Sequence, residues 1–168
     1  AVAAGAGGHA GVKSPFALIQ EIREWFDGPV ALSGSIATGG AILAAQAMGA
    51  DLAYIGSAFI ATEEARAADD YKQAVVDGTS DDIVLSNLFT GVHGNYLAPS
   101  ILKAGLDPEH LPESDPSKMN FGGGAQKAWK DIWGCGQGIG AVKAVVPAAE
   151  LVARLKREYQ AAKQRLAL

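Results

Sequence analysis

Several features that would place this protein in a special class are missing. The chain has one cysteine, so no disulfide framework can form within it. No apolar run approaches the ~18 residues that span a bilayer, and residues 1–12 lack the charged and long apolar regions of a secretory signal peptide. The formal net charge is −4, with both signs spread along the chain, whereas nucleic-acid binding needs a basic stripe. We therefore expect a soluble, cytoplasmic protein that binds neither membranes nor nucleic acids.

Glycine, by contrast, is abundant. The chain contains 21 glycines in 168 residues, where ~7% is typical. They gather in loops at residues 5–11, 34–40, 122–124 and 134–140, so the excess is not low complexity. The first of these loops opens the chain with no element before it, and we expect an N-terminal part of the protein to precede it.

Short apolar segments alternate with helical patterns in the first third of the chain. Ser14-Pro15 is a typical helix start, and an Ala-rich helix is predicted over residues 41–48. Residues 30–32 and 52–55 are short apolar runs, typical of buried strands. This order predicts an α/β fold with a parallel sheet, either a (β/α) barrel or a doubly wound sheet. In both, ligands bind at the loops that follow the carboxyl ends of the strands.

After about residue 67 the alternation stops. We expect a helix that begins at Thr62, with further helices over residues 69–78, 95–104 and 147–166. Pro99 would break or bend the helix over residues 95–104 unless the helix starts there. Residues 82–90 predict either a strand or an apolar helical turn. Residues 106–124 carry three prolines and predict an irregular segment, and residues 126–133 a short helix.

Residues 136–141 match the pattern G-x-G-x-x-G/A of dinucleotide-binding loops. No strand leads into this pattern, and the chain ends before a second strand with an acidic ribose partner could follow. We therefore predict a tight connecting loop here.

The stretch Ala6-Gly7-Gly8-His9 is the first candidate for a functional loop. Two glycines let the backbone approach a planar or phosphorylated ligand, and a histidine beside them can act as a base or a hydrogen-bond donor near neutral pH. The alternative is a flexible N-terminal stretch with an incidental histidine.

Two further loops follow the predicted strands, Ser33-Gly34-Ser35 and Ile55-Gly56-Ser57. Backbone N–H groups and serine hydroxyls at such turns can surround a phosphate. One such loop is a weak signal, because every turn from strand to helix favours glycine, but two in succession point to a phosphate site.

The remaining candidate residues give weaker evidence of a function. Cys135 is flanked by glycines and has no histidine beside it in sequence, so we expect a structural role. His93 and His110 lack the spacing of metal ligands, and we predict no metal site.

Taken in order, these motifs resemble the nitronate monooxygenase family, formerly called 2-nitropropane dioxygenases. The family's stretches read approximately AGGH-x-G, GGI and MGT-x-F-x-x-T-x-E-S. The matching motifs here are Ala6-Gly7-Gly8-His9-Ala10-Gly11, Ser33-Gly34-Ser35-Ile36, Ile55-Gly56-Ser57-Ala58-Phe59, Thr62-Glu63-Glu64-Ala65, Gly94-Asn95-Tyr96-Leu97-Ala98-Pro99-Ser100, Gly105-Leu106-Asp107-Pro108, Trp129-Lys130-Asp131-Ile132-Trp133 and Gly136-Gln137-Gly138. The resemblance covers essentially the whole chain.

The resemblance implies a flavoprotein that binds FMN noncovalently on a TIM barrel. The chain would be the C-terminal part of a (β/α)8 barrel with a small inserted α-rich substrate domain. Residues 1–66 would hold the last βα units, residues 67–132 the small domain, and residues 133–168 a return segment and a helix that packs on the barrel. The first βα units, the missing N-terminal part of the barrel, would complete the flavin site. A homodimer is possible within this family resemblance.

The resemblance also implies roles for individual residues. His9 matches the active-site histidine. The residues expected to contact the cofactor lie in three loops: Ala6, Gly7 and Gly8; Ser33, Gly34 and Ser35; Tyr54, Ile55, Gly56 and Ser57. Ser35 stands where a second glycine is usual, Ser57 where threonine is usual, and Gly5 where many members carry glutamate.

The function implied is the FMN-dependent oxidation of alkyl nitronates with O₂. Two alternatives share the fold: an NADH:quinone reductase and an enoyl-thioester reductase. An alternative of another class is a noncatalytic module that binds a phosphate ligand.

Overall fold

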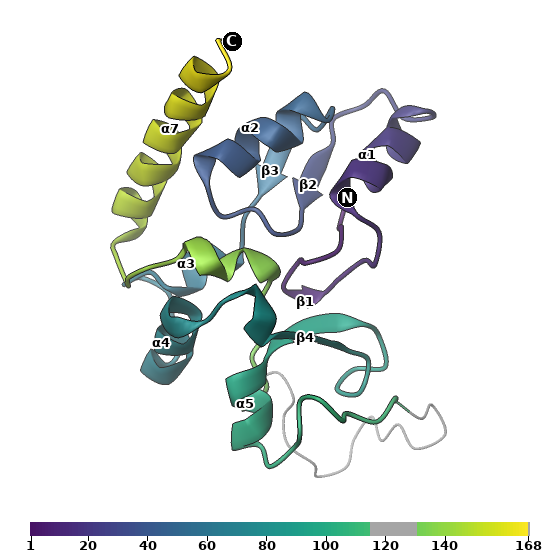
Figure 1. Cartoon of the computed structure of the whole chain (residues 1–168), viewed down its shortest axis with the longest axis vertical. Helices are drawn as coiled ribbons and strands as arrows, with labels where there is room; N and C mark the ends of the chain where they lie inside the picture. Colours follow the sequence, from purple (N-terminus) through teal and green to yellow (C-terminus); the bar gives the residue numbers. More distant parts are fainter. Residues whose placement is uncertain (115–130, 168) are drawn as a thin grey trace.

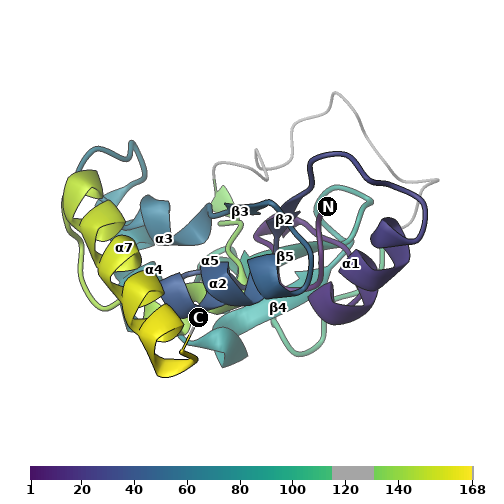
Figure 2. The same cartoon turned by 90° about the horizontal axis from the view of Figure 1, so that it is seen from above.

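A computed structural model describes residues 1–114 and 131–167. The fold is mixed α/β, with a parallel strand pair and a separate antiparallel sheet. In Figure 1 the parallel pair lies in the upper part of the molecule and the antiparallel sheet below it. Helices α7 and α1 lie at opposite ends, and Figure 2 shows the same separation from above.

The parallel pair confirms the prediction from the first third of the sequence. β2 (Ala31–Ser33) and β3 (Leu52–Tyr54) pair with Ala31 opposite Leu52 and Ser33 opposite Tyr54. Val2 forms a further parallel bridge to Ser33, so the start of the chain lies along the other edge of β2. Three stretches therefore run side by side in one direction, as expected for βα units.

Two helices cover one face of this pair. α1 (Pro15–Arg23) begins directly after Ser14, and α2 (Gly39–Ala47) is capped by the Thr38 side chain, which accepts from Ala41 N–H at 3.1 Å. Leu32 is fully buried in a cluster with Ala3, Ile19, Val30, Ala45 and Ala50. The other face stays open: Leu52 is 63% exposed and Tyr54 is 68% exposed.

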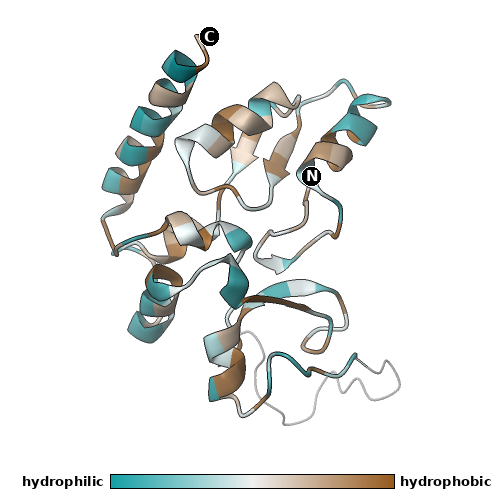
Figure 3. Ribbon diagram, in the orientation of Figure 1, coloured by the Kyte–Doolittle hydropathy of each residue, from teal (hydrophilic) through white to brown (hydrophobic). Residues whose placement is uncertain are grey.

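The C-terminal helix α7 (Ala148–Arg165) packs against α2. A Cβ at Gly39 would overlap the Tyr159 backbone nitrogen, so the two helix backbones touch at this point. The Glu158 carboxylate accepts a hydrogen bond from Gly39 N–H at 2.8 Å and satisfies a donor at the start of α2. Figure 3 shows hydrophilic and hydrophobic residues alternating along α7, as expected for a helix with one buried face.

The antiparallel sheet has the order β1-β5-β4. It consists of β1 (Gly8–His9), β4 (Ile83–Ser86) and β5 (Gly94–Leu97). β5 lies in the middle and all four of its residues are buried. Around it lie α4 (Asp69–Asp77), the 3₁₀ helix η1 (Ser80–Asp82) and α5 (Ala98–Lys103).

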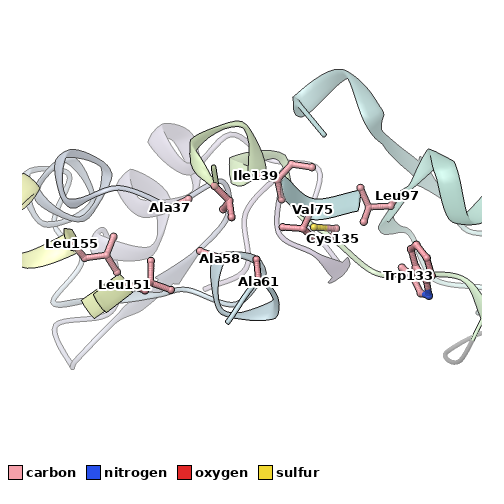
Figure 4. Close-up of a cluster of buried hydrophobic side chains, with 11 residues drawn as sticks. Ala37, Ala58, Ala61, Val75, Leu97, Trp133, Cys135, Ile139, Leu151 and Leu155 are labelled. Carbon is pink, nitrogen blue, oxygen red and sulfur yellow. The ribbon is translucent and has the colours of Figure 1, made fainter. Parts of the chain in front are cut away.

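One hydrophobic cluster joins the two parts. It includes Leu151 and Leu155 on α7 and Leu97 on β5, and Cys135 lies between them, beside Val75 (Figure 4). Burial raises the pKa of the Cys135 thiol to about 11, so it stays protonated near neutral pH. Cys135 therefore has the structural role expected from the sequence.

Two helix predictions are wrong in position. No helix begins at Thr62, because α3 (Ser57–Ile60) lies before it and the Thr62 hydroxyl donates to the Phe59 carbonyl at 2.8 Å. Residues 95–97 belong to β5 and not to a helix. α5 begins only at Ala98 because Pro99, which has no N–H to donate, suits the first turn of a helix.

Of the other secondary-structure predictions, some are confirmed and some lie outside the described residues. α4 and α7 confirm the helices expected over residues 69–78 and 147–166. Residues 137–141 form the short 3₁₀ helix η3 (Gln137–Ala141), a tight connection of the predicted kind. Residues 115–130, which include most of the predicted irregular segment and short helix, lie outside the described residues. No helix within residues 1–114 or 131–167 is long and apolar enough to cross a bilayer.

Candidate active site

A cavity of about 380 Å³ lies where the carboxyl ends of β2 and β3 meet the N-terminal loop. Its volume falls in the range of small-molecule sites, ~300–1,000 Å³. Four stretches contribute most of the wall: residues 5–8, 33–37, 54–60 and 133–138. The position at the carboxyl ends of parallel strands is where α/β folds bind ligands.

Nine of the ten residues predicted to contact a cofactor line this cavity. They are Ala6, Gly7, Gly8, Ser33, Gly34, Ser35, Tyr54, Gly56 and Ser57. The tenth, Ile55, is half-buried and packs against the hydrophobic cluster around Cys135. The fold therefore gathers three loops that are well separated in the sequence.

His9 lies beside this wall and not in it. It directly follows Gly8, which lines the cavity, and belongs to β1, the edge strand of the antiparallel sheet. Its side chain is exposed, and the Nε2 atom is 3.0 Å from the Thr90 hydroxyl. His9 and Gly8 are thus the predicted site residues held by the antiparallel sheet.

Residues 133–138, called the return segment below, form the wall that the sequence did not predict. They lie against the backbone of the N-terminal loop: Gln137 N–H donates to the Gly5 carbonyl at 2.9 Å. A Cβ at Gly136 would lie 2.5 Å from the Gly5 carbonyl oxygen and 2.9 Å from the Gly7 nitrogen. Glycine at position 136 is required because two backbones meet there.

The Ser57 side chain also holds the return segment. Its Oγ accepts a hydrogen bond from Gly136 N–H at 2.8 Å, and the Ser57 hydroxyl also interacts with the Cys135 thiol. The hydroxyl expected to face a phosphate is therefore engaged with the protein wall. Ser57 lines the cavity beside this contact.

Ser35 carries backbone strain at the edge of the cavity. Its φ is +56°, in the left-handed region that costs a non-glycine residue roughly 1–2 kcal/mol. A Cβ at Gly5 would overlap the Ser35 Oγ and lie 2.7 Å from the Gln137 Oε1. Two of the three departures from the family pattern, Gly5 and Ser35, are therefore sterically coupled.

The surroundings of Gly56 indicate whether the cavity suits a bound group. A Cβ at this position would meet no atom within 4 Å, and its φ of −113° is open to any residue. Packing and backbone conformation within the described residues therefore give no reason for glycine here. Because Gly56 lines the cavity, the missing side chain leaves space for a ligand that approaches the backbone.

Two aromatic rings also line the cavity. Tyr71 and Trp133 are stacked, with ring centroids 4.9 Å apart and planes 11° apart, and both line the cavity. The Tyr71 hydroxyl donates to the Gly134 carbonyl at 2.5 Å, and burial raises its pKa well above the usual value, so it remains a donor. The Lys103 ammonium lies 5.4 Å from the centre of the Trp133 ring.

Neither ring was a candidate from the sequence. Tyr71 belongs to none of the motifs, and the motif that ends at Trp133 was given no role in ligand binding. The glycines on both sides of Cys135 were the available signal, since they permit the backbone contact that brings Trp133 to the cavity. In residues 1–114 and 131–167, no three His, Cys, Asp or Glu side chains gather into a set that could hold a metal ion.

Comparison with known families gives an independent view of the chain. A family model described as nitronate monooxygenase matches residues 2–158. A nitronate monooxygenase of Paraburkholderia phytofirmans is 31% identical over 171 residues, which cover 92% of this chain and 47% of that protein. A putative monooxygenase of Mycobacterium tuberculosis is 38% identical over 87 residues, or 51% of this chain and 23% of that protein. The chain thus spans about half the length of the first of these relatives.

Solved structures show the same relationship. A nitroalkane oxidase from Streptomyces ansochromogenes superposes with a TM-score of 0.76 at 29% identity, covering 99% of this chain and 52% of that one. FabK from Thermotoga maritima superposes with a TM-score of 0.74 at 19% identity, covering 98% of this chain and 55% of that one. The second likeness is one of fold alone.

Proposed function

The chain belongs to the nitronate monooxygenase family, and on that premise we propose that it forms the C-terminal part of an FMN-dependent enzyme that oxidises alkyl nitronates with O₂. The observation that carries the proposal is the single cavity shared by nine predicted residues from three separate loops. A family of oxidoreductases and a cavity at the carboxyl ends of parallel strands point to the same kind of site.

The cavity divides by chemistry into two parts. Gly34, Ser35, Gly56 and Ser57 follow the ends of β2 and β3 and would hold the phosphate of FMN. Gly7 and Gly8, backed by the return segment, would face the ring system. When bound, the flavin supplies the electron transfer from substrate to O₂, and the protein supplies orientation and electrostatics.

His9 is the residue we assign to the substrate. It directly follows the loop proposed to face the flavin ring, and β1 fixes its backbone against Gly94 of β5. A histidine at this position can stabilise the negative charge of a nitronate, or take the α-proton from a neutral nitroalkane. We therefore propose His9 as the catalytic residue of this part of the enzyme.

We also propose that β2, β3 and the stretch at Val2 are neighbouring strands of a (β/α)8 barrel. The exposed Val2, Leu52 and Tyr54 support this, because other strands of the barrel would cover such an apolar face. The proposed division is residues 1–66 for the barrel, 67–132 for the substrate domain, and 133–168 for the return to the barrel.

The first experiment tests the cofactor with a matched pair of glycines. Gly56 lines the cavity, Gly140 does not, and a Cβ at either position meets no atom within 4 Å. Gly56→Ala is expected to weaken FMN binding at least tenfold by titration of flavin fluorescence, while Gly140→Ala leaves it within about twofold. Protein that stays colourless after addition of FMN would favour the noncatalytic phosphate-binding module.

The second experiment tests the reaction. We expect oxygen uptake that depends on added alkyl nitronate, and His9→Asn should reduce turnover by 10²–10⁴-fold, the usual contribution of a general acid or base, while FMN remains bound. Turnover equal to wild type would remove His9 from the reaction. Rapid bleaching of the flavin by NADH without O₂, with no nitronate-dependent uptake, would favour the reductases instead.

A further inference from the structure

The C-terminal helix α7 reaches the loop after β2 from outside the cavity. Arg154 of α7 donates two hydrogen bonds, from Nη1 to the Ala141 carbonyl at 2.8 Å and from Nη2 to the Ala37 carbonyl at 3.2 Å. Ala37 lines the cavity, whereas none of the described lining residues belongs to α7. Arg154 instead lines a separate cavity of about 200 Å³. Its guanidinium therefore holds a wall residue of the main cavity without entering that cavity.

Glu158, one turn further along α7, makes a second connection to the same loop. Its Oε2 accepts a hydrogen bond from Gly39 N–H at 2.8 Å, and its Oε1 lies 3.6 Å from Arg154 Nε. Side chains four residues apart on a helix share one face, so this ion pair keeps both groups on the side of α7 that meets the loop. The end of the loop is thus held at the Ala37 carbonyl and, two residues later, at Gly39 N–H.

The backbone donors of this loop contribute little to its support. The N–H groups of Ile36, Ala37 and Thr38 donate to no atom of the described residues, although Ala37 is only 3% exposed. Successive N–H groups of this kind can form a concave site that binds an anion. A loop that keeps these donors for a ligand cannot use them to hold its own shape, so its support has to come through its carbonyls.

We propose that Arg154 is a positioning residue for the phosphate of the cofactor: by holding the Ala37 carbonyl, it sets the direction of the N–H groups in the loop. The carbonyl and the N–H of one trans peptide unit point in opposite directions, so a carbonyl drawn toward α7 turns Thr38 N–H away from α7. Arginine suits this task because its planar guanidinium is always charged and can span two carbonyls at once. The inference rests on the proposed function, which assigns the phosphate to this loop.

Comparison of FMN with riboflavin, which has the same ring system and no phosphate, isolates this role. Arg154→Met keeps most of the aliphatic packing of the side chain and removes both hydrogen bonds. We expect it to weaken FMN binding about tenfold, or ~1.4 kcal/mol, by titration of flavin fluorescence, and to change riboflavin binding at most twofold. An equal loss for both flavins, or an unchanged affinity for FMN, would overturn the inference.

Arg157→Met is the matched control for charge. It removes one positive charge from the same helix and leaves both hydrogen bonds of Arg154 in place. Both flavin affinities should therefore stay within about twofold of wild type. A loss of FMN affinity as large as that in Arg154→Met would mean that charge alone is responsible, and would contradict a positioning role.

Hydrogen exchange in the flavin-free protein provides a second readout. Ser35 and Gly39 each donate an N–H hydrogen bond within the protein, and in Arg154→Met both amides should exchange about threefold to tenfold faster. The Leu97 amide, hydrogen-bonded on the antiparallel side, should change less than twofold. Equal acceleration at all three amides would indicate a general loss of stability and overturn the inference, as would unchanged exchange at Ser35 and Gly39. Wild-type protein that binds neither flavin would refute the proposed function, and the exchange rates would still decide whether Arg154 holds the loop.

Discussion

The two sheets differ in how fully the described residues cover them. β5, in the middle of the antiparallel sheet, is buried at all four residues, whereas β3 of the parallel pair exposes 63% of Leu52 and 68% of Tyr54. Yet the parallel side supplies most of the loops proposed to hold the cofactor. The better-covered antiparallel sheet therefore holds His9, and the more open parallel pair supplies most of the loops that line the cavity.

The cavity exists because these regions meet through backbone contacts. The return segment leaves the antiparallel side, where Cys135 N–H donates to the Asn95 carbonyl at 3.0 Å, and then crosses to the N-terminal loop at Gly5. Apolar surfaces alone would not fix this distance, since the hydrophobic effect has no direction. The hydrogen bonds and glycines of the return segment set the width of the cavity.

The largest effect is therefore expected where the two backbones touch. Gly136→Ala should destabilise the protein by about 2–3 kcal/mol, because its Cβ would press on Gly5 and Gly7 backbone atoms that cannot rotate away. The φ of Gly136 is −97°, so the loss would come from packing and not from backbone conformation. Urea unfolding followed by circular dichroism measures it.

Gly140→Ala is the matched control, because a Cβ at Gly140 meets no atom within 4 Å. We expect its free energy of unfolding to stay within about 0.5 kcal/mol of wild type, as for substitutions away from special features. Equal stability of the two variants would mean that the close contact at Gly136 is not what joins the regions.

A smaller loss is expected at Asn95, which ties β5 to the same loop. Its side chain is buried, and its Nδ2 donates to the Ala6 carbonyl at 2.7 Å. Asn95→Leu keeps a similar volume and leaves that carbonyl without this donor, so we expect a loss of ~2 kcal/mol. Hydrogen exchange at the amides of residues 5–8 should rise with it. Unchanged exchange there would show that the loop is held by other contacts.

Sequence patterns predicted the parallel side well because each of its signals is local. A short apolar run, a glycine turn and an Ala-rich helix follow one another within β2, α2 and β3, and each can be identified without knowing its neighbours. The antiparallel sheet gave weaker signals: residues 82–90, which contain β4, fit either a strand or a helical turn. β1 has two residues, too few for any period, and β5 runs directly into α5, so its residues read as the start of that helix.

The site divides in the same way. Loops at Gly7, Gly34 and Gly56 were predicted because glycine at the end of a strand carries a local meaning. Tyr71 and Trp133 were not predicted as site residues. Their stacking depends on contact between segments 62 residues apart in the sequence, and on the hydrogen bond from the Tyr71 hydroxyl to the Gly134 carbonyl. Long-range contacts of this kind arise from tertiary packing, which no spacing rule describes.

The smallest change in stability is expected on the parallel side, at Ser35, whose φ is +56°. Ser35→Gly should raise the free energy of unfolding by ~0.5–1 kcal/mol without ligand, since glycine adopts this conformation without the Cβ penalty. Ser80→Gly is the control. Among the described residues only Ser35 and Ala167 have a positive φ without being glycine, so Ser80 has no such strain to relieve. Glycine at position 80 should therefore lower the free energy of unfolding by ~0.5 kcal/mol.

If the strained serine is kept for the proposed phosphate, Ser35→Gly should also weaken FMN binding about threefold to tenfold while the protein becomes more stable. Such opposite signs are typical of strain stored at a functional site. Fluorescence titration and urea unfolding of the same samples measure both quantities. Stabilisation with unchanged affinity would assign Ser35 to packing beside Gly5 and Gln137, and would leave the backbone groups of the two turns as the phosphate ligands.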